Sequence, residues 1–375
     1  MQSRPTPARP TTRPTQPRPT HGGNLTWAAS LAGCPPADIL DFSASINPLG
    51  LPQSAVSAIQ ANLGALRDYP DPDYLTLRQA LSQQHDLPIE WILPGNGAAE
   101  LLTWAGRELA KLTATYLLTP SFSDYLRALS SFGAKIVRQP LKLDPSLAQP
   151  HLLIPAPPGS GLLLNNPHNP TGRLFSAKAV LPLLYQFALV VIDEAFMDFL
   201  PPAEQQSLIH LVPKYPNLVI LRSLTKFYSL PGLRLGYAIA HPDRLNRWQT
   251  WRDPWSVNLL AAEAGVAVLQ DRAFQQQTWD WLPPARQQLF EGLAQLPGLQ
   301  PFPGSANFLL VQSQVAASAL QQRLLCQDQI LIRDCLSFPE LGEAYFRVAV
   351  RRLSENQRLL EALADSLPHL PPRNA

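Results

Sequence analysis

Cysteine is scarce in this 375-residue chain. The three cysteines, Cys34, Cys326 and Cys335, show no spacing typical of a metal site or a redox pair, and so few of them argue against a disulfide framework. We therefore expect a reducing compartment, the cytoplasm. Long hydrophobic runs are missing too: no apolar stretch approaches the ~18 residues of a membrane span, and no signal-peptide core follows Met1. We expect no membrane partner.

Charged residues make up only 15% of the chain, and the formal net charge is +2. Residues 1–20 carry four arginines (Arg4, Arg9, Arg13 and Arg18) and no acid, so subtracting these four charges from +2 leaves −2 for the rest. This remainder has no basic footprint for nucleic acid. Six prolines in residues 1–20 predict a disordered extension. An organelle transit peptide is the alternative, although this proline content opposes its usual amphipathic helix.

Beyond residue 90, short apolar runs alternate with helical segments, which is typical of a mostly parallel sheet covered by helices on both faces. The runs lie at 116–118, 135–137, 162–164, 188–192, 218–221 and 236–240. Residues 93–97 indicate a Gly-rich turn, and 176–186 and 255–269 indicate one helix each. We predict an α/β fold with a large domain containing this sheet and a smaller α+β domain. The expected division is a disordered extension over 1–20, an N-terminal arm of the small domain over 21–47, a large domain over 48–254 and a small domain over 255–375.

Three polar residues follow predicted strands closely: Asn169, Asp193 and Lys226. Because the carboxyl ends of parallel strands meet at one edge of a sheet, we expect these side chains to converge. A fourth element is the helix that begins after the Gly-rich turn at Gly97, since the free N–H groups of its first turn suit an anion. The sequence therefore predicts one ligand site at this edge.

Pyridoxal 5′-phosphate needs all four elements. Its aldehyde binds a lysine amine, its ring nitrogen a carboxylate and its ring oxygen a donor, and these roles are open to Lys226, Asp193 and Asn169. Its phosphate needs backbone N–H groups, hydroxyls and a cation, and its ring needs an aromatic face. The candidates for these roles are Ala98, Ala99, Ser223, Thr225, Arg234 and Phe122.

Each candidate also has an ordinary structural explanation. Asp193 could cap a helix, Asn169 could make a turn, Phe122 could belong to the core, and Arg234 could form a surface ion pair. A single cofactor accounts for all of these residues with one geometry, so we favour the cofactor site.

Four motifs in this order resemble the fold-type I pyridoxal-phosphate enzymes, in the branch that contains histidinol-phosphate aminotransferase. They are Asn169-Pro-Thr-Gly172, Asp193-Glu-Ala-Phe196, Ser223-Leu-Thr-Lys226 and Gly232-Leu-Arg-Leu-Gly236, and the resemblance covers residues 21–366. Within the branch, the chain most resembles the threonine-phosphate decarboxylases of cobalamin biosynthesis. That likeness rests on His21-Gly-Gly-Asn24, Asp41 to Gly50, Asp193 to Phe199 and Leu331-Ile-Arg-Asp-Cys335.

The resemblance implies a role for each matching residue. Lys226 anchors the cofactor, Asp193 pairs with its ring nitrogen, Asn169 donates to its ring oxygen, and Phe122 stacks on its ring. The phosphate is held by Ala98, Ala99, Ser223, Thr225 and Arg234 and by Tyr69 of a neighbouring subunit, which implies a homodimer with shared sites. The substrate carboxylate is bound by Arg347, and its phosphate end by Arg333, His21, Gly23 and Asn47. One departure is Phe196, which stands where many aminotransferases have a tyrosine that donates to the ring oxygen.

The implied activity is decarboxylation of a small phosphorylated amino acid, L-threonine O-3-phosphate. Transamination of histidinol phosphate needs the same cofactor residues and stays the alternative, because only the orientation of the substrate separates the two reactions. A non-catalytic sensing module of the same fold is a third hypothesis, but the chain has no recognisable DNA-binding domain, and residues 1–20 carry no aromatic side chain for stacking on bases.

Overall fold

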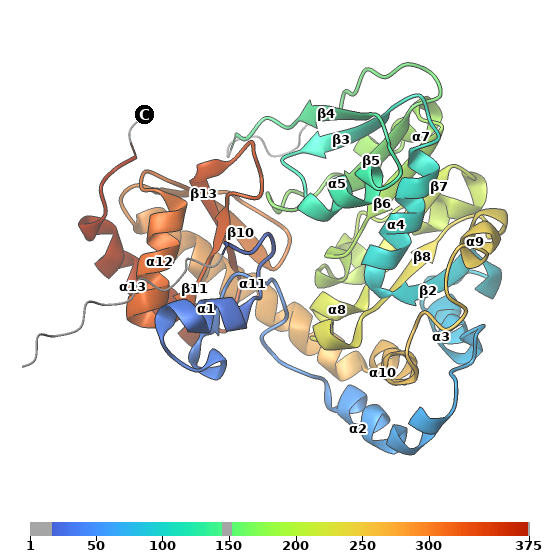
Figure 1. The fold of residues 1–375 in the computed structure, drawn as a ribbon, viewed down its shortest axis with the longest axis horizontal. Helices are drawn as coiled ribbons and strands as arrows, with labels where there is room; N and C mark the ends of the chain where they lie inside the picture. The colour runs from blue at the N-terminus through green and yellow to red at the C-terminus, as the bar shows by residue number, and fades with distance from the viewer. Residues whose placement is uncertain (1–16, 145–151, 374–375) are drawn as a thin grey trace, which may run out of the picture.

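The computed structural model describes residues 17–144 and 152–373 (Figure 1). Most of the predicted extension, residues 1–16, lies outside the described residues. Two α/β parts lie side by side in Figure 1, one built on a seven-stranded sheet and the other on a four-stranded sheet. Within the described residues, no helix is long and apolar enough to cross a membrane.

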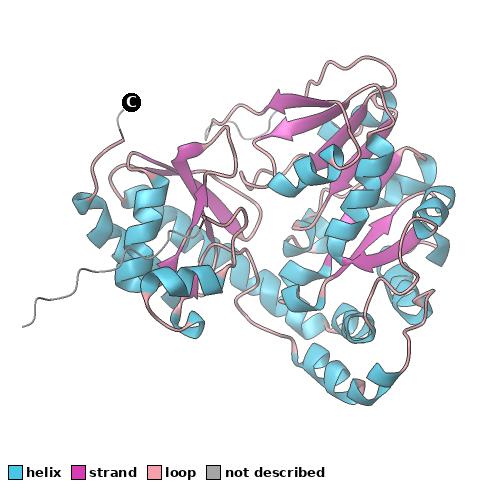
Figure 2. Ribbon diagram, viewed as in Figure 1, coloured by secondary structure: helices cyan, strands magenta, loops and turns pink. Residues whose placement is uncertain are grey.

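The large sheet has the strand order β2-β8-β7-β6-β5-β3-β4, and β8 alone runs antiparallel to its neighbours. Every residue of β5, β6 and β7 is buried, because helices cover both faces of the sheet (Figure 2). The fold class predicted from the sequence is thereby confirmed. The strands are β2 Ile92–Asn96, β3 Thr115–Thr119, β4 Ile136–Pro140, β5 Gly161–Asn165, β6 Leu189–Asp193, β7 Leu218–Ser223 and β8 Leu235–Ile239.

Alternate residues of the central strands enter two different cores. Val191 and Val219 belong to the core that includes α4 and α5, whereas Val190 and Ile192 belong to the core that includes α3 and α10. This alternation follows from the two-residue period of a strand. The helices of this part are α2 Gln53–Ala61, α3 Leu75–His85, α4 Gly97–Leu109, α5 Ser123–Ser130, α6 Ala177–Val180, α7 Leu183–Gln186, α8 Leu224–Phe227, α9 Pro242–Gln249 and α10 Leu259–Gln270.

The smaller part has an antiparallel sheet with the strand order β12-β13-β10-β9. The N-terminal segment packs on this part, since α1 contacts α12 and β1 pairs in parallel with β11. Its strands are β1 Leu40–Asp41, β9 Leu299–Pro301, β10 Phe308–Ser313, β11 Ile330–Leu331, β12 Arg333–Cys335 and β13 Gly342–Ala349. Its helices are α1 Leu25–Ala32, α11 Arg272–Gln295, α12 Ala317–Asp328 and α13 Leu353–Ser366.

The structure corrects three local expectations. The predicted turn over 93–97 is mostly strand β2, and Pro94 is tolerated there because β2 lies at the edge of the sheet. The helix expected over 255–269 begins only at Leu259, where the Asn258 side chain accepts from the N–H of Ala261 and caps it. The single helix expected over 176–186 is instead two short helices, α6 and α7. Helix α9 was not predicted.

Helix α10 packs against α2 and α3, so the part of the chain that covers the large sheet extends past residue 254. The predicted domain boundary at this residue therefore falls five residues before the first residue of a helix that still belongs, by its contacts, with the large sheet.

The close packing of α4 on α5 depends on Gly106. A Cβ atom at this position would lie 2.5 Å from the backbone oxygen of Ala128 in α5. We expect Gly106→Ala to lower the free energy of unfolding by about 1–3 kcal/mol, because the two helices must separate. Gly64→Ala is the matched control, since a Cβ there would meet nothing within 4 Å. Urea unfolding of both variants tests this, and equal midpoints would contradict it.

Candidate active site

A cavity of about 220 Å³ lies between the two parts of the molecule. Seven of the residues that the sequence analysis selected line it, and they come from both parts. These residues are His21, Phe122, Asn169, Asp193, Lys226, Arg333 and Arg347. The convergence expected at the carboxyl ends of β5, β6 and β7 is therefore present in the structure.

Lys226 lies in α8, directly after β7, and its partly buried side chain lines the cavity. Its Nζ atom donates to Ser223 Oγ at 3.2 Å. Burial lowers the pKa of Lys226 below its ordinary value, the carboxylate of Asp193 opposes this shift, and Arg234 adds to it. The amine is thus less readily protonated than an exposed lysine, which suits a nucleophile.

Asp193 ends strand β6, and each of its carboxylate oxygens accepts one hydrogen bond. The backbone N–H of Ala195 donates to Oδ1 at 2.9 Å, and the hydroxyl of Tyr125 donates to Oδ2 at 2.8 Å. Burial raises the pKa of Asp193, while Lys226 and these two donors lower it. The sequence analysis missed Tyr125, although its position three residues after Phe122 places both rings on one side of a short helix.

Asn169 and Arg347 are joined across the cavity, because Nη1 of Arg347 donates to Oδ1 of Asn169. Nη2 of the same arginine donates to the backbone oxygen of Ser43 at 3.2 Å, and the guanidinium lies 4.8 Å from the centre of the Phe308 ring. Among the described residues, the buried Nε of Arg347 has no partner. Burial, with a further contribution from Arg333, lowers its pKa to about 10. A buried cation with a free donor indicates an anion site.

Arg333 pairs with Arg347 in the β12–β13 register, so two guanidinium groups lie on neighbouring strands. Arg333 donates to the backbone oxygens of Pro19, at 3.3 Å, and Thr20, and to Ser337 Oγ at 2.6 Å. The N-terminal segment therefore runs directly over this arginine.

His21, the next residue of that segment, places its ring 5.5 Å from the ring of Phe122. Burial lowers the pKa of His21, and Arg333 lowers it further. This end of the cavity therefore combines an imidazole, an aromatic ring and two cations.

A tightly packed cradle lies beside Lys226 at the start of α4. A Cβ on Gly97 would lie 2.4 Å from Arg234 Nη2, and one on Gly236 would lie 2.5 Å from the backbone nitrogen of Ala98. Only glycine leaves room there for Arg234 and for the backbone N–H groups of the first turn of α4, which include those of Ala98 and Ala99. The hydroxyls of Ser223 and Thr225, 2.8 Å apart, face one another on the adjacent turn. This donor set fits a phosphate.

The five predicted residues of the cradle (Ala98, Ala99, Ser223, Thr225 and Arg234) do not line the cavity, and three further predicted residues also lie outside its lining. Tyr69 is 79% exposed and stacks on Trp255, with ring centres 4.5 Å apart. Asn47 is buried and donates to Phe227 O and Thr278 Oγ1, both at 2.8 Å, so its amide has a structural role. Gly23 faces a smaller neighbouring pocket. In their place, Gly22 and Ser45 line the cavity, and among the described residues the buried hydroxyl of Ser45 has no partner.

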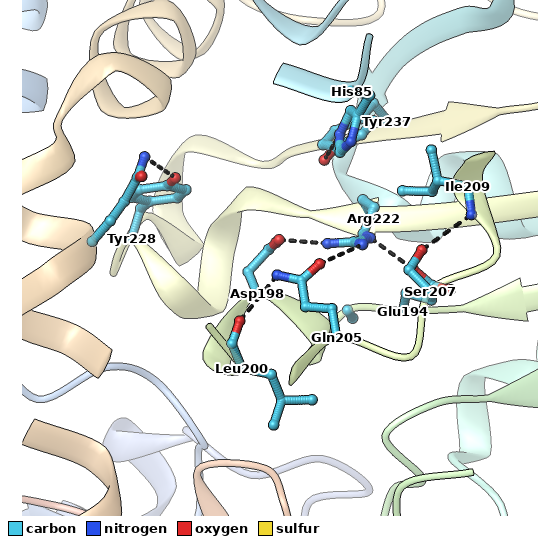
Figure 3. Close-up of polar contacts among 12 residues, drawn as sticks. His85, Glu194, Asp198, Leu200, Gln205, Ser207, Ile209, Arg222, Tyr228 and Tyr237 are labelled. Atoms are coloured by element: carbon cyan, nitrogen blue, oxygen red, sulfur yellow. Dashed lines mark hydrogen bonds and ion pairs between the residues drawn. The ribbon is translucent and has the colours of Figure 1, made fainter. Parts of the chain in front are cut away.

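Beneath the site, a buried ion-pair cluster joins the ends of β6 and β7 (Figure 3). Arg222, 1% exposed, donates through Nε to Glu194 at 2.9 Å, through Nη1 to Asp198, and through Nη2 to Gln205 at 3.3 Å. Ser207 donates to the same Glu194 oxygen at 2.7 Å. Burial raises the pKa of both Glu194 and Asp198, and Arg222 opposes this shift. We call these residues (Glu194, Asp198, Gln205, Ser207 and Arg222) the Arg222 cluster.

Residues 37–363 match the model of the family described as aminotransferase class I and II. The chain belongs to this family. Its members use pyridoxal 5′-phosphate, the cofactor that the strand-end residues predicted and that the phosphate cradle and the neighbouring Lys226 and Asp193 fit.

Individual relatives resemble the chain over nearly its whole length. A threonine-phosphate decarboxylase of Salmonella typhimurium is 42% identical over 94% of this chain and 98% of its own. An adenosylcobalamin biosynthesis bifunctional protein of Leptospira interrogans is 30% identical over 92% of this chain and 41% of its own. The crystal structure of L-threonine-O-3-phosphate decarboxylase from Porphyromonas gingivalis superposes with a TM-score of 0.79 at 26% identity, covering 87% of this chain and 99% of that chain.

The contacts of the Arg222 cluster lead us to a prediction about the stability of the fold. Arg222→Met leaves the buried Glu194 and the partly buried Asp198 without their cation, so we expect the free energy of unfolding to fall by about 3–5 kcal/mol. The matched control is Arg67→Met, which removes an ion pair whose side chains are 85% and 69% exposed and should leave unfolding unchanged. Urea unfolding at pH 7 measures both, and a wild-type midpoint for Arg222→Met would refute the prediction.

Proposed function

We propose that the chain is a threonine-phosphate decarboxylase of cobalamin biosynthesis. It converts L-threonine O-3-phosphate to 1-amino-2-propanol O-2-phosphate and CO₂ with pyridoxal 5′-phosphate as cofactor. The observation that carries the proposal is the pair of buried guanidinium groups, Arg333 and Arg347, in the same cavity as Lys226 and Asp193. A substrate with a phosphate at one end and a carboxylate at the other needs two such cations. The names of the relatives from Salmonella typhimurium and Leptospira interrogans support the same activity and pathway.

The chain's own residues hold the cofactor as follows. Lys226 binds it covalently, Asp193 pairs with its ring nitrogen, Asn169 donates to its ring oxygen and Phe122 covers its ring. Its phosphate lies in the cradle formed by Ala98, Ala99, Ser223, Thr225 and Arg234. When bound, the cofactor supplies an electron-withdrawing ring that accepts the electron pair released as CO₂ leaves.

The two arginines orient the substrate. Arg347 binds the carboxylate, and its hydrogen bond to Asn169 ties the position of that carboxylate to the cofactor side of the cavity. Arg333 binds the phosphate, with His21 beside it. Lys226 can return a proton to the α-carbon, because burial lowers the pKa of its amine and makes proton exchange easier.

A second copy of the chain completes the site. Tyr69 lies outside its own cavity and is 79% exposed, which leaves it free to contact the cofactor phosphate of a partner subunit. Leu63 and Leu66, in the short helix just before Tyr69, are 52% and 55% exposed, and such exposed apolar side chains suit a homodimer. Free Cys34, Cys326 and Cys335 agree with a cytoplasmic location.

Transamination of histidinol phosphate is the competing activity, because the family description itself names aminotransferases. Phe196 weighs against it. This side chain is buried against Phe308, with ring centres 5.0 Å apart, and cannot donate the second hydrogen bond to the ring oxygen that a tyrosine gives many aminotransferases.

The two activities are separated by incubating the purified chain with threonine phosphate and measuring CO₂. We expect CO₂ release and the yellow absorbance of the lysine-bound cofactor, both lost in Lys226→Ala. Absence of CO₂ together with consumption of 2-oxoglutarate on histidinol phosphate would replace the decarboxylase with the aminotransferase. A colourless wild-type protein would refute the cofactor site itself.

Arg333 should decide selectivity for the phosphate group. We expect Arg333→Gln to lower kcat/KM for threonine phosphate about 100-fold or more, because a desolvated ion pair with the phosphate is lost. The same variant should change kcat/KM for unphosphorylated threonine only a few-fold. Steady-state rates of CO₂ release with both substrates measure this, and equal losses on the two would show that Arg333 does not contact the phosphate.

A further inference from the structure

We propose that Tyr125 is a positioning residue whose buried hydroxyl fixes the orientation and the charge of the Asp193 carboxylate. The inference rests on the proposed pairing of Asp193 with the cofactor ring nitrogen. It concerns a residue that none of the sequence motifs singled out.

The geometry gives Tyr125 one specific partner. Its ring is 2% exposed, and its hydroxyl donates to Asp193 Oδ2 at 2.8 Å, crossing from α5 to the end of β6. The backbone N–H of Ala195 occupies Oδ1, so the carboxylate is held by one donor on each oxygen. The carboxylate therefore cannot rotate without breaking a hydrogen bond.

Tyr125 also connects Asp193 with the aromatic face of the site. The rings of Tyr125 and Phe122 meet edge to face, with centres 5.6 Å apart and planes at 89°. Both residues line the cavity, and both belong to the start of α5. One helical turn thus supplies the residue proposed to cover the cofactor ring and the residue that holds the carboxylate proposed to pair with it.

The charges around Asp193 explain why a donor is needed. The titratable groups that face it are Lys226 from α8 and Tyr125 and Asp124 from α5. Burial and Asp124 favour the protonated carboxyl, whereas Lys226, Tyr125 and Ala195 favour the carboxylate. Burial raises the pKa of Tyr125 well above its ordinary value, so its hydroxyl remains a donor at every pH of interest. A protonated Asp193 would be a poor partner for a positively charged ring nitrogen.

The first test is the dissociation constant of pyridoxal 5′-phosphate for the full-length chain. Tyr125→Phe removes only the hydroxyl, and we expect it to weaken cofactor binding about 10- to 100-fold, as for one hydrogen bond to a charged group. Tyr116→Phe is the matched control: Tyr116 is also buried, on β3, and its ring packs on Phe187. In an Asp193→Asn background the Tyr125 substitution should change affinity less than about threefold, because the partner is already altered.

The second test separates positioning from simple packing through pH. The pKa of Asp193 in the folded chain lies above its unfolded value, so its contribution to stability falls as pH rises between these two values. Tyr125→Phe should raise the pKa of Asp193 in the folded chain further, because a hydrogen bond that lowers this pKa is lost. Without added cofactor, the free energy of unfolding of this variant should therefore lie only slightly below that of the wild type near pH 4, which is about the ordinary pKa of an unfolded aspartate. The difference should grow towards pH 7. A packing defect alone gives a deficit independent of pH.

Two results would overturn the assignment of Tyr125. One is wild-type cofactor affinity in Tyr125→Phe, and the other is a pH-independent deficit like that of Tyr116→Phe. Failure of the wild-type chain itself to bind the cofactor would instead refute the proposed function, and the role of Tyr125 with it.

Discussion

The buried charge of Arg222 is the constraint on which the rest of the site depends. A guanidinium that is 1% exposed is tolerable only beside fixed anions, and Glu194 and Asp198 supply them. Two of these charged residues directly adjoin, in the sequence, a residue proposed to hold the cofactor. Glu194 follows Asp193, and Arg222 precedes Ser223. Together with the pairing of β6 and β7, the Arg222 cluster therefore ties the ends of these two strands to one another, directly beside Asp193 and Ser223.

The geometry of the parallel sheet explains which site residues the sequence could predict. Asn169, Asp193 and Lys226 were found because a parallel sheet brings all its carboxyl strand ends to one edge, whatever the details of packing. The alternation of apolar runs with helices likewise predicted the large sheet. Strand β2 was missed because Pro94 and Gly95 resemble a turn, and only its position at the sheet edge makes them acceptable in a strand.

Residues whose position depends on contacts between distant segments could not be predicted in this way. The arm that carries Ser45 and Asn47 is placed by the pairing of β1 with β11, almost three hundred residues apart in the chain, and by the hydrogen bonds of Asn47 to α8 and α11. A one-residue change in register exchanges the face of an extended segment, so spacing alone could not decide which side chain enters the cavity. Tyr125 was missed for a related reason, since its only mark in the sequence is its distance from Phe122.

The two arginines show how the cavity favours a substrate with two anionic ends. Arg333 and Arg347 are register partners, and Arg333 lowers the pKa of Arg347 in addition to the effect of burial. Among the described residues, Arg333 donates to carbonyls of the N-terminal segment and to Ser337, and Arg347 donates to an amide and a carbonyl. These acceptors are neutral, so they do not neutralise the positive charge of either guanidinium. A monoanion can neutralise one guanidinium and leaves the other repelled and desolvated, whereas a ligand bearing both phosphate and carboxylate neutralises the two together.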